Sequence, residues 1–339
     1  MFRFIVYNVV NPATFASLTD SRHVKRQDEP ARTLLNLAGG VFVREQILKT
    51  QPIRIEKKSS NVLDIHANVS AGYEKWYLLR SDAHHDSADC NRELEKRHLD
   101  MARERNAHIL DFGDLFDCMQ GRYDPRKSYK DMRPEYLKAL SKSESYFNVI
   151  TEDAINFYKP YRDLWALQAV GNHETSVAKN SDINLLDLFV AGMQKDGGIV
   201  SKGAYGGWVQ FLFTISGTQR ERIRLKYFHG SGGGGPVTKG VIQSNRQAVF
   251  LPDAQIVVNG HIHESWVLSM PRERISEGGV IYQDMQYHVR TATYKDDYKD
   301  GAGGWHIERG APPKPMGCVW LRFYYERKHM QMQFIQDVE

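Results

Sequence analysis

The chain has 339 residues, of which 41% are hydrophobic and 25% are charged, and its formal net charge is +4. This composition is ordinary for a soluble globular protein, and so mild a charge does not by itself indicate nucleic-acid binding. The three cysteines form no CxxC pair, which argues against a disulfide framework and a zinc–thiolate site and favours a cytoplasmic location. No apolar run approaches the roughly 18 residues of a membrane span, so we expect no membrane partner.

Residues 1–70 differ in character from the rest of the chain. They are polar and contain none of the motifs described below. We therefore predict an N-terminal extension over residues 1–70 and one α/β domain over residues 71–339. The extension either packs on the domain as decoration or serves as an arm for a partner, including a homodimer.

From residue 73 onward, short apolar runs alternate with helical patterns, which is typical of an α/β domain. The predicted strands of this part are Trp76–Arg80, Ala107–Phe112 and Trp165–Val170, and the predicted helices are Arg92–Asn106, Ser145–Tyr158 and a helix capped by Ser181 or Asp182. After residue 200 the chain turns to β structure. Its predicted strands are Trp208–Ile215, Arg222–Phe228, Gln255–Asn259, Trp266–Met270, Val280–Met285 and Val319–Tyr325.

Five short motifs follow five of these strands, and each contains a residue type that binds divalent metals. They supply two Asp, one Asn and four His: Asp82, His84, Asp114, Asn172, His229, His261 and His263. Open α/β sheets bind ligands at the carboxyl ends of their strands, so we expect these side chains to meet there. The pairs Asp82/His84 and His261/His263 are two residues apart, which in an extended strand end directs both side chains the same way.

Seven such ligands are enough for two metal ions side by side. Asp114 is the natural bridge between them. We assign Asp82, His84 and His263 to one ion, and Asn172, His229 and His261 to the other. Two ions about 3.5–4 Å apart clamp the attacking and leaving oxygens of a phosphoryl displacement. The mixed nitrogen and oxygen ligands favour Mn²⁺, with Zn²⁺ or Fe as alternatives, over Mg²⁺.

The motifs DAH, GDLFD, GNHE, FHG and GHIH resemble those of the calcineurin-like metallophosphoesterase superfamily, over about residues 73–330. The stretches RELEKRHLD, GDLFDCMQGRYDPR and GGWHIERGAPPKP resemble bacteriophage-encoded members, which would place the protein in the host cytoplasm. GDLFD is also more similar to the SbcD-type DNA repair nucleases than to protein phosphatases. The resemblance implies a four-layer α/β/β/α sandwich with the metals at the sheet edge.

The same resemblance implies a mechanism in which a hydroxide held by the two ions attacks phosphorus. It implies that His173, which follows the ligand Asn172, faces the substrate, where it stabilises charge or protonates the leaving group. Glu174 either orients His173 or merely begins a helix. His85 either contacts substrate or is an ordinary loop residue.

The substrate is the least determined feature. The segment 121–142 carries seven Lys and Arg, with Arg122 and Arg126 nearest the metal motifs, and could form a basic rim for a nucleic acid. A solvated loop and helix would look the same. We therefore expect a phosphodiesterase acting on DNA or nucleotides. The alternatives are a phosphomonoesterase or cyclic-nucleotide hydrolase, and a non-catalytic metal-binding or assembly protein.

Overall fold

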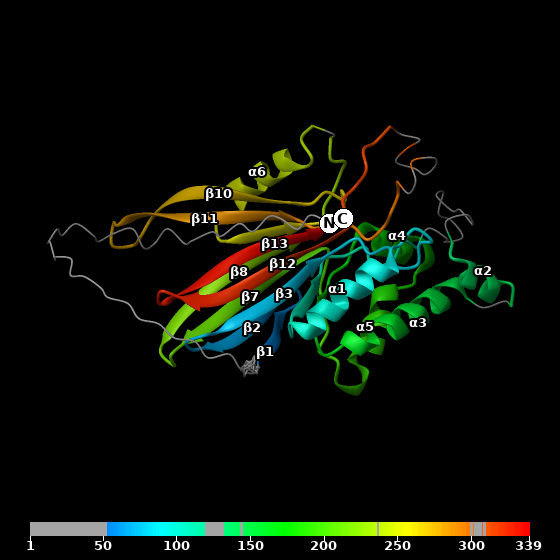
Figure 1. Ribbon diagram of the computed structural model, residues 1–339, viewed down its shortest axis with the longest axis horizontal. Helices are drawn as coiled ribbons and strands as arrows, with labels where there is room; N and C mark the ends of the chain where they lie inside the picture. Colours follow the sequence, from blue (N-terminus) through cyan, green and yellow to red (C-terminus); the bar gives the residue numbers. More distant parts are fainter. Residues whose placement is uncertain are drawn as a thin grey trace, which may run out of the picture.

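The computed structural model describes residues 53–118, 132–142, 145–235, 237–298, 301, 307 and 310–339. Two mixed β-sheets pack face to face at the centre of this part of the chain (Figure 1). The larger sheet has the strand order β1 (Arg54–Ser59), β2 (Val62–Val69), β7 (Gly206–Ile215), β8 (Gln219–Phe228), β9 (Ile256–Asn259), β11 (Ile281–Arg290) and β10 (Trp266–Ile275). The smaller sheet has the order β13 (His329–Val338), β12 (Gly317–Glu326), β3 (Glu74–Arg80), β4 (His108–Asp111), β5 (Trp165–Gln168) and β6 (Ser201–Lys202).

The described helices flank these sheets on both sides. They are α1 (Arg92–Glu104), α2 (Pro134–Leu140), α3 (Tyr146–Tyr158), α4 (Asn172–Ser181), α5 (Leu185–Gln194) and α6 (Val241–Phe250), with short 3₁₀ turns at Lys159–Tyr161 and Lys195–Gly197. Figure 1 shows α1 to α5 grouped at the smaller sheet and α6 beside β10 and β11. The predicted α/β/β/α sandwich is confirmed, with α6 as the described helix of its fourth layer.

Alternation of side chains along the strands explains the layers. In β3, Leu78 belongs to the hydrophobic cluster beneath the helices, whereas Tyr77 and Leu79 belong to the cluster between the sheets. The Tyr77 ring meets that of Phe211 from the other sheet, with 4.9 Å between centroids. A strand of the smaller sheet that is buried on both faces therefore contributes side chains to both hydrophobic clusters.

The larger sheet begins before the boundary expected at residue 70. Strands β1 and β2 pair with each other, and β2 pairs in parallel with β7 over Val62–Val69. Leu63 and Ile65 are buried between the sheets. Residues 54–69 are thus part of the domain, because their alternate apolar side chains complete its core. Residues 1–52 lie outside the described residues, and the arm predicted there stays a prediction.

Within the described part of the chain, every helix is too short or too polar to span a bilayer.

Candidate metal centre

The seven predicted ligands come together at one edge of the two sheets. Each follows the carboxyl end of a strand, as expected: Asp82 and His84 after β3, Asp114 after β4, Asn172 after β5, His229 after β8, and His261 and His263 after β9. The parallel arrangement of β3, β4 and β5 brings the first three loops side by side, and β8 beside β9 does the same in the other sheet.

The local backbone differs from the expected extended strand ends. Asp82, His84, His261 and His263 all have positive φ, between 47° and 74°, and Asp114 has φ 52°. Non-glycine residues rarely adopt this conformation, and those that do cluster at functional sites held by their surroundings. Backbone hydrogen bonds between loops hold them here, from Asp82 N to Gly113 O at 2.9 Å and from His84 N to Asp114 O at 3.1 Å.

One group of donors gathers around Asp82. His84 Nε2 and His263 Nε2 lie 3.3 Å apart, and His263 Nε2 lies 3.5 Å from Asp82 Oδ1. That carboxylate oxygen is buried and accepts no hydrogen bond with good geometry from a described residue. Burial raises the pKa of Asp82, but His263 and His229 lower it further, to about 2. Two facing imidazole nitrogens beside an ionised oxygen without a donor fit a metal ion, which would accept all three lone pairs.

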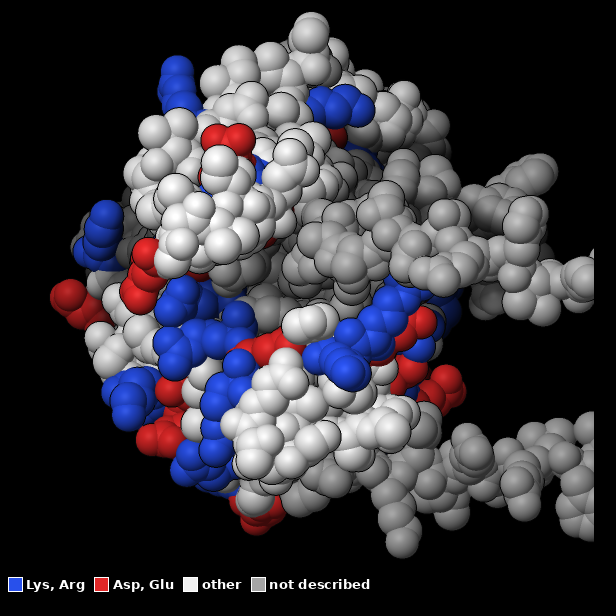
Figure 2. Space-filling model, turned by 90° about the vertical axis from the view of Figure 1, so that its left-hand side faces the viewer, with Lys and Arg blue, Asp and Glu red and all other residues white. Residues whose placement is uncertain are grey.

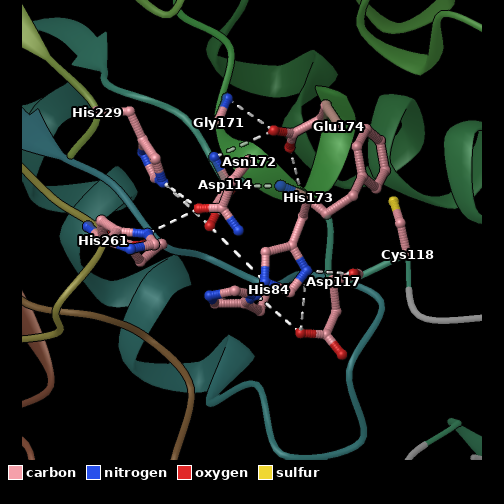
Figure 3. A network of polar contacts seen from close by, with 12 residues as sticks. His84, Asp114, Asp117, Cys118, Gly171, Asn172, His173, Glu174, His229 and His261 are labelled. Carbon is pink, nitrogen blue, oxygen red and sulfur yellow. Dashed lines mark hydrogen bonds and ion pairs between the residues drawn. The ribbon is translucent and has the colours of Figure 1, made fainter. Parts of the chain in front are cut away.

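A second group gathers around Asn172. Its Oδ1 lies 2.7 Å from His261 Nδ1 and 3.1 Å from His229 Nε2 (Figure 3). His229 Nε2 also lies 3.1 Å from Asp114 Oδ2. The amide presents its oxygen to the group, as predicted. The other ring nitrogen of His229, Nδ1, lies 3.0 Å from the carbonyl oxygen of Phe112 and donates a hydrogen bond to it. Nε2 is therefore the nitrogen whose lone pair can bind a metal ion.

Asp114 connects the two groups. Its carboxylate lies in one cluster with His229 and His261 and in another with His84 and His173, in each of which all ligand atoms lie within 4.8 Å of one another. The third cluster of this edge is Asp82 with His84 and His263. Burial raises the pKa of Asp114, but His229 and His173 hold it well below its usual range. These are the positions expected of a carboxylate that bridges two ions.

His173 lies at the rim of the site beside Asp114 (Figure 3). Its Nδ1 is 2.5 Å from the backbone oxygen of Asp117, to which its N–H donates a hydrogen bond, and its Nε2 is 3.8 Å from Asp114 Oδ2. The Nε2 atom therefore faces the two groups of donors. The structure places His173 next to the predicted ligands without taking it into the group around Asn172.

Glu174 lies in the first turn of α4, in line with the helix-start alternative. Its carboxylate accepts hydrogen bonds from the backbone N–H groups of Gly171 at 2.8 Å, Phe116 at 3.0 Å and Asp114 at 3.3 Å. Burial and the nearby Asp114 raise the pKa of Glu174 to about 7. Glu174 thus ties the start of α4 to the loop that carries Asp114, and its catalytic assignment stays a prediction.

An outer ring of charges, not predicted from the sequence, connects His84 to His263. Asp117 Oδ1 lies 2.8 Å from His84 Nδ1 and 3.1 Å from Lys295 Nζ. Lys295 Nζ lies 3.6 Å from Asp297, whose other oxygen is 3.8 Å from His263 Nδ1. Carboxylates behind ligand histidines fix the ring orientation and tautomer. Asp117 stands in the GDLFD motif and could have been noticed there, whereas Lys295 carries no sequence signal.

Three residues were predicted to contact substrate, and the structure describes one of them, His85. His85 is fully buried, with its Nδ1 3.1 Å from the hydroxyl of Tyr158 and its Nε2 3.3 Å from Asp153, so it packs between helices and does not reach the site. The loop alternative for His85 is therefore correct. Arg122 and Arg126 lie outside the described residues.

No protein-family model and no curated protein matches this chain. Among solved structures, 21 chains are similar to it. Vacuolar Protein Sorting 29 from Cryptosporidium parvum is 11% identical over 79% of this chain and 100% of its own, with a TM-score of 0.32. A predicted phosphoesterase from Streptococcus pneumoniae is 9% identical over 78% and 90%, with a TM-score of 0.28. GAP50, the anchor in the inner membrane complex of Plasmodium, is 9% identical over 78% and 84%, with a TM-score of 0.39.

Similarities of this size assign no family and no activity to the chain, whose described residues form an α/β fold of two mixed sheets flanked by helices, with clustered His and Asp side chains at the sheet edge.

Proposed function

We propose that this protein hydrolyses phosphoesters with two divalent metal ions held at the sheet edge. One observation supports the proposal above all others. Two groups of metal-type donors, from loops of both sheets, share the single carboxylate of Asp114. A packed core has no need of so many buried polar groups facing one another, because each costs free energy unless it is paired.

The donor set decides which residues would hold the ions. Asp82, His84, Asp114 and His263 would hold one, and Asp114, Asn172, His229 and His261 the other. When bound, such a pair of ions lowers the pKa of water and stabilises charge on phosphoryl oxygens. Imidazole and carboxylate ligands together suit Mn²⁺, Zn²⁺ or Fe, of which we propose Mn²⁺.

The chain's own contribution to the reaction would centre on His173. Its Nδ1–H donates to the backbone oxygen of Asp117, so when the ring carries a second proton, on Nε2, that N–H can give its proton to a leaving oxygen or a hydrogen bond to a phosphoryl oxygen. The edge position of the ring, with 12% of the side chain exposed, leaves room for a substrate to approach. Asp117 would keep this nitrogen aimed at the reacting group.

We further propose a phosphodiester of a nucleic acid or nucleotide as the substrate. The support is the basic segment 121–142, which begins seven residues after Asp114 in the chain. A monoester or cyclic nucleotide would use the same donors, so the substrate class needs a direct test.

Metal-free protein reloaded with Mn²⁺ would be offered bis(p-nitrophenyl) phosphate, p-nitrophenyl phosphate, a cyclic nucleotide and linear DNA. We expect turnover of the diester and DNA, and a loss of about 10²–10⁴-fold in kcat in His173→Ala. His329→Ala, a histidine at the β12–β13 turn, is the matched control. Turnover of the monoester alone would overturn the substrate class. Two bound ions without turnover of any substrate would overturn the enzymatic proposal in favour of a binding or assembly role.

A further inference from the structure

Three arginines stand in a row on the outer face of β8. Arg220, Arg222 and Arg224 alternate with Ile223 and Leu225, which are buried between the sheets. They lie opposite the outward residues of the neighbouring strand β7, in the pairs Arg220–Thr214, Arg222–Leu212 and Arg224–Gln210. We propose that this face binds a strand of nucleic acid through its phosphate backbone.

The charges of this row are not neutralised within the protein. No carboxylate among the described residues forms an ion pair with Arg220, Arg222 or Arg224, whereas Arg54, Arg92 and Arg272 all have such partners. The nearby acidic side chains are engaged elsewhere. Glu221 accepts hydrogen bonds from the backbone N–H of Met330 and from Gln219, and contacts His329. Asp64 accepts one from Gln210.

The surface around the row is hollowed. A depression of about 570 Å³ is lined by His66, Leu212, Phe213, Thr214, Arg220, Glu221, Arg222 and Arg224. Figure 2 looks at the end of the molecule where the strand hairpins turn, and shows Lys and Arg side chains there next to Asp and Glu side chains. Figure 1 shows the labelled helices lying away from this hairpin end. Arg220 and Arg222 are exposed and Arg224 is half-buried, so a ligand can reach the row from solvent.

The spacing favours a polyanion over a single anion. Alternate residues of a strand are about 6.6 Å apart, so the three guanidinium groups repeat along a straight line of about 13 Å. Lys226 extends the row by one more position, with its Nζ 5.4 Å from the centre of the Trp208 ring. Repeated positive charge next to an aromatic ring is the combination that binds single-stranded nucleic acid.

A second hollow distinguishes a nucleic acid from an acidic peptide. It has a volume of about 210 Å³ and shares Arg222 and Glu221 with the first. Half of its lining is apolar, with Ile223, Met285, Tyr287, Met330 and Met332, and half is polar, with Glu221, Arg222, Gln255, Asp284 and Gln331. A base has an apolar face and polar edges, so a base of a bound strand can insert there beside its own phosphate on Arg222, whereas the carboxylates of an acidic peptide would meet those of Glu221 and Asp284.

The row of arginines runs along β8 toward the candidate metal centre. Strand β8 ends at Phe228, and the candidate ligand His229 follows directly. Arg224 precedes His229 by five residues, which corresponds to about 16 Å of extended chain. A bound strand would thus extend toward the metal centre, a step that rests on the proposed function, whereas the binding itself does not.

Binding would be measured by fluorescence anisotropy with a labelled single-stranded oligonucleotide, in EDTA so that no hydrolysis occurs, over a series of salt concentrations. The test variant is Arg220→Ala/Arg222→Ala/Arg224→Ala. We expect the slope of log K against log salt to fall by about 2, because each lost phosphate contact removes roughly 0.7 for a single strand. Affinity at low salt should fall at least tenfold.

The control removes the same charge elsewhere, in Lys179→Ala/Lys195→Ala/Arg246→Ala, all exposed residues of other elements. It should leave the slope unchanged. The three arginines replaced by lysine should keep most of the slope, which shows that the alanine variant failed through charge and not through misfolding. An unchanged slope in the alanine variant, or displacement of the oligonucleotide by poly-glutamate at equal charge, would overturn the proposal. Neither outcome depends on whether the metal centre turns over substrate.

Discussion

Asp114 is shared by the two groups of donors, so replacing it should change the metal content more than replacing a ligand of one group. We expect Asp114→Ala to lose both metal ions, because its carboxylate lies in clusters on either side. Asp82→Ala should lose mainly the ion of its own group with His84 and His263. Metal content after gel filtration, measured by inductively coupled plasma mass spectrometry, checks this. Asp253→Ala, at an exposed position, is the control. Two ions bound to Asp114→Ala would refute the bridge.

His229 makes metal binding depend on pH. Burial lowers its pKa, but Asp114 and Asp82 raise it overall to about 10. The metal-free site therefore holds a proton on His229 at neutral pH, and a metal ion must displace that proton from Nε2. Because the folded pKa lies above the unfolded value near 6.5, this proton stabilises the metal-free fold below pH 6.5, and the effect is lost as the pH rises through 10.

Apparent metal affinity should accordingly rise with pH over the range 6 to 9, with net proton release. Calorimetric titration at pH 7.5 in buffers of different ionisation enthalpy would measure the protons released per ion. An affinity that does not change with pH, with no proton release, would contradict this account of His229.

Lys295 is a buried cation between two carboxylates. It holds the pKa of Asp117 well below its usual range, together with His84, against the effect of burial. Lys295→Met would leave the charges of Asp117 and Asp297 without their cation, and such losses cost about 3–5 kcal/mol of unfolding free energy. Urea unfolding in EDTA would measure it. Lys295→Arg should retain part of the stability, and Lys138→Met, on the exposed side of α2, should change little. A loss under about 1 kcal/mol would mean that the ring of charges contributes nothing here.

At the scale of elements, the start of α4 has to come very close to the loop after β4. A Cβ atom on Gly171 would clash with the carboxylate of Asp114. Gly171→Ala should therefore displace Asp114 and weaken metal binding at least 10–100-fold, the range seen when partners of metal ligands are altered. Metal titration of the purified variant would show it. Gly233→Ala, where a Cβ atom meets nothing within 4 Å, is the matched control. Normal affinity in Gly171→Ala would show that the two loops can separate without cost.

The elements that the sequence predicts well are those with apolar side chains in a clear period. The strands ahead of the ligands were found because each is a short apolar run between polar residues, and α1 and α3 because one face of each is apolar. Helix α4 was missed because Val177 is its one buried apolar residue. As a consequence the next helix was expected to begin at Ser181 or Asp182, whereas α5 begins at Leu185 with Asn184 as its N-cap.

The strand order predicts that the ligands lie close together, but it does not predict the directions in which their side chains point. Positive φ at Asp82 and His261 depends on contacts between loops that are far apart in the chain. The same is true of β13, whose alternating glutamines, including the buried Gln331 and Gln333, conceal a strand that pairs with β12. A pattern within one segment predicts the local structure of that segment. The positive φ of the ligands and the pairing of β13 depend instead on contacts between two segments.

At the scale of the whole molecule, the two sheets hold each other in place through one shared core. Its residues come from β2, β7, β8, β9 and β11 of one sheet and from β3, β4, β5, β12 and β13 of the other. The loops with Asp82, Asp114 and Asn172 extend from one sheet, and those with His229 and His261 from the other. The geometry of the candidate metal centre therefore depends on how the sheets pack, and β2 is part of that packing.

Truncation at the N-terminus tests this dependence. Deleting residues 1–52 leaves every described element in place, so we expect an unfolding temperature and a metal content close to those of the full chain. Deleting residues 1–70 removes β1 and β2 with the buried side chains of Leu63, Ile65 and Val69. It also exposes the edge of β7, which invites aggregation. Losing three such side chains costs roughly 6 kcal/mol, comparable with the entire stability of a typical domain. Thermal unfolding and gel filtration of both proteins would distinguish them. A soluble 71–339 protein that unfolds at the full chain's temperature would show that the domain begins at residue 71, and that β2 contributes little to the packing that shapes the site.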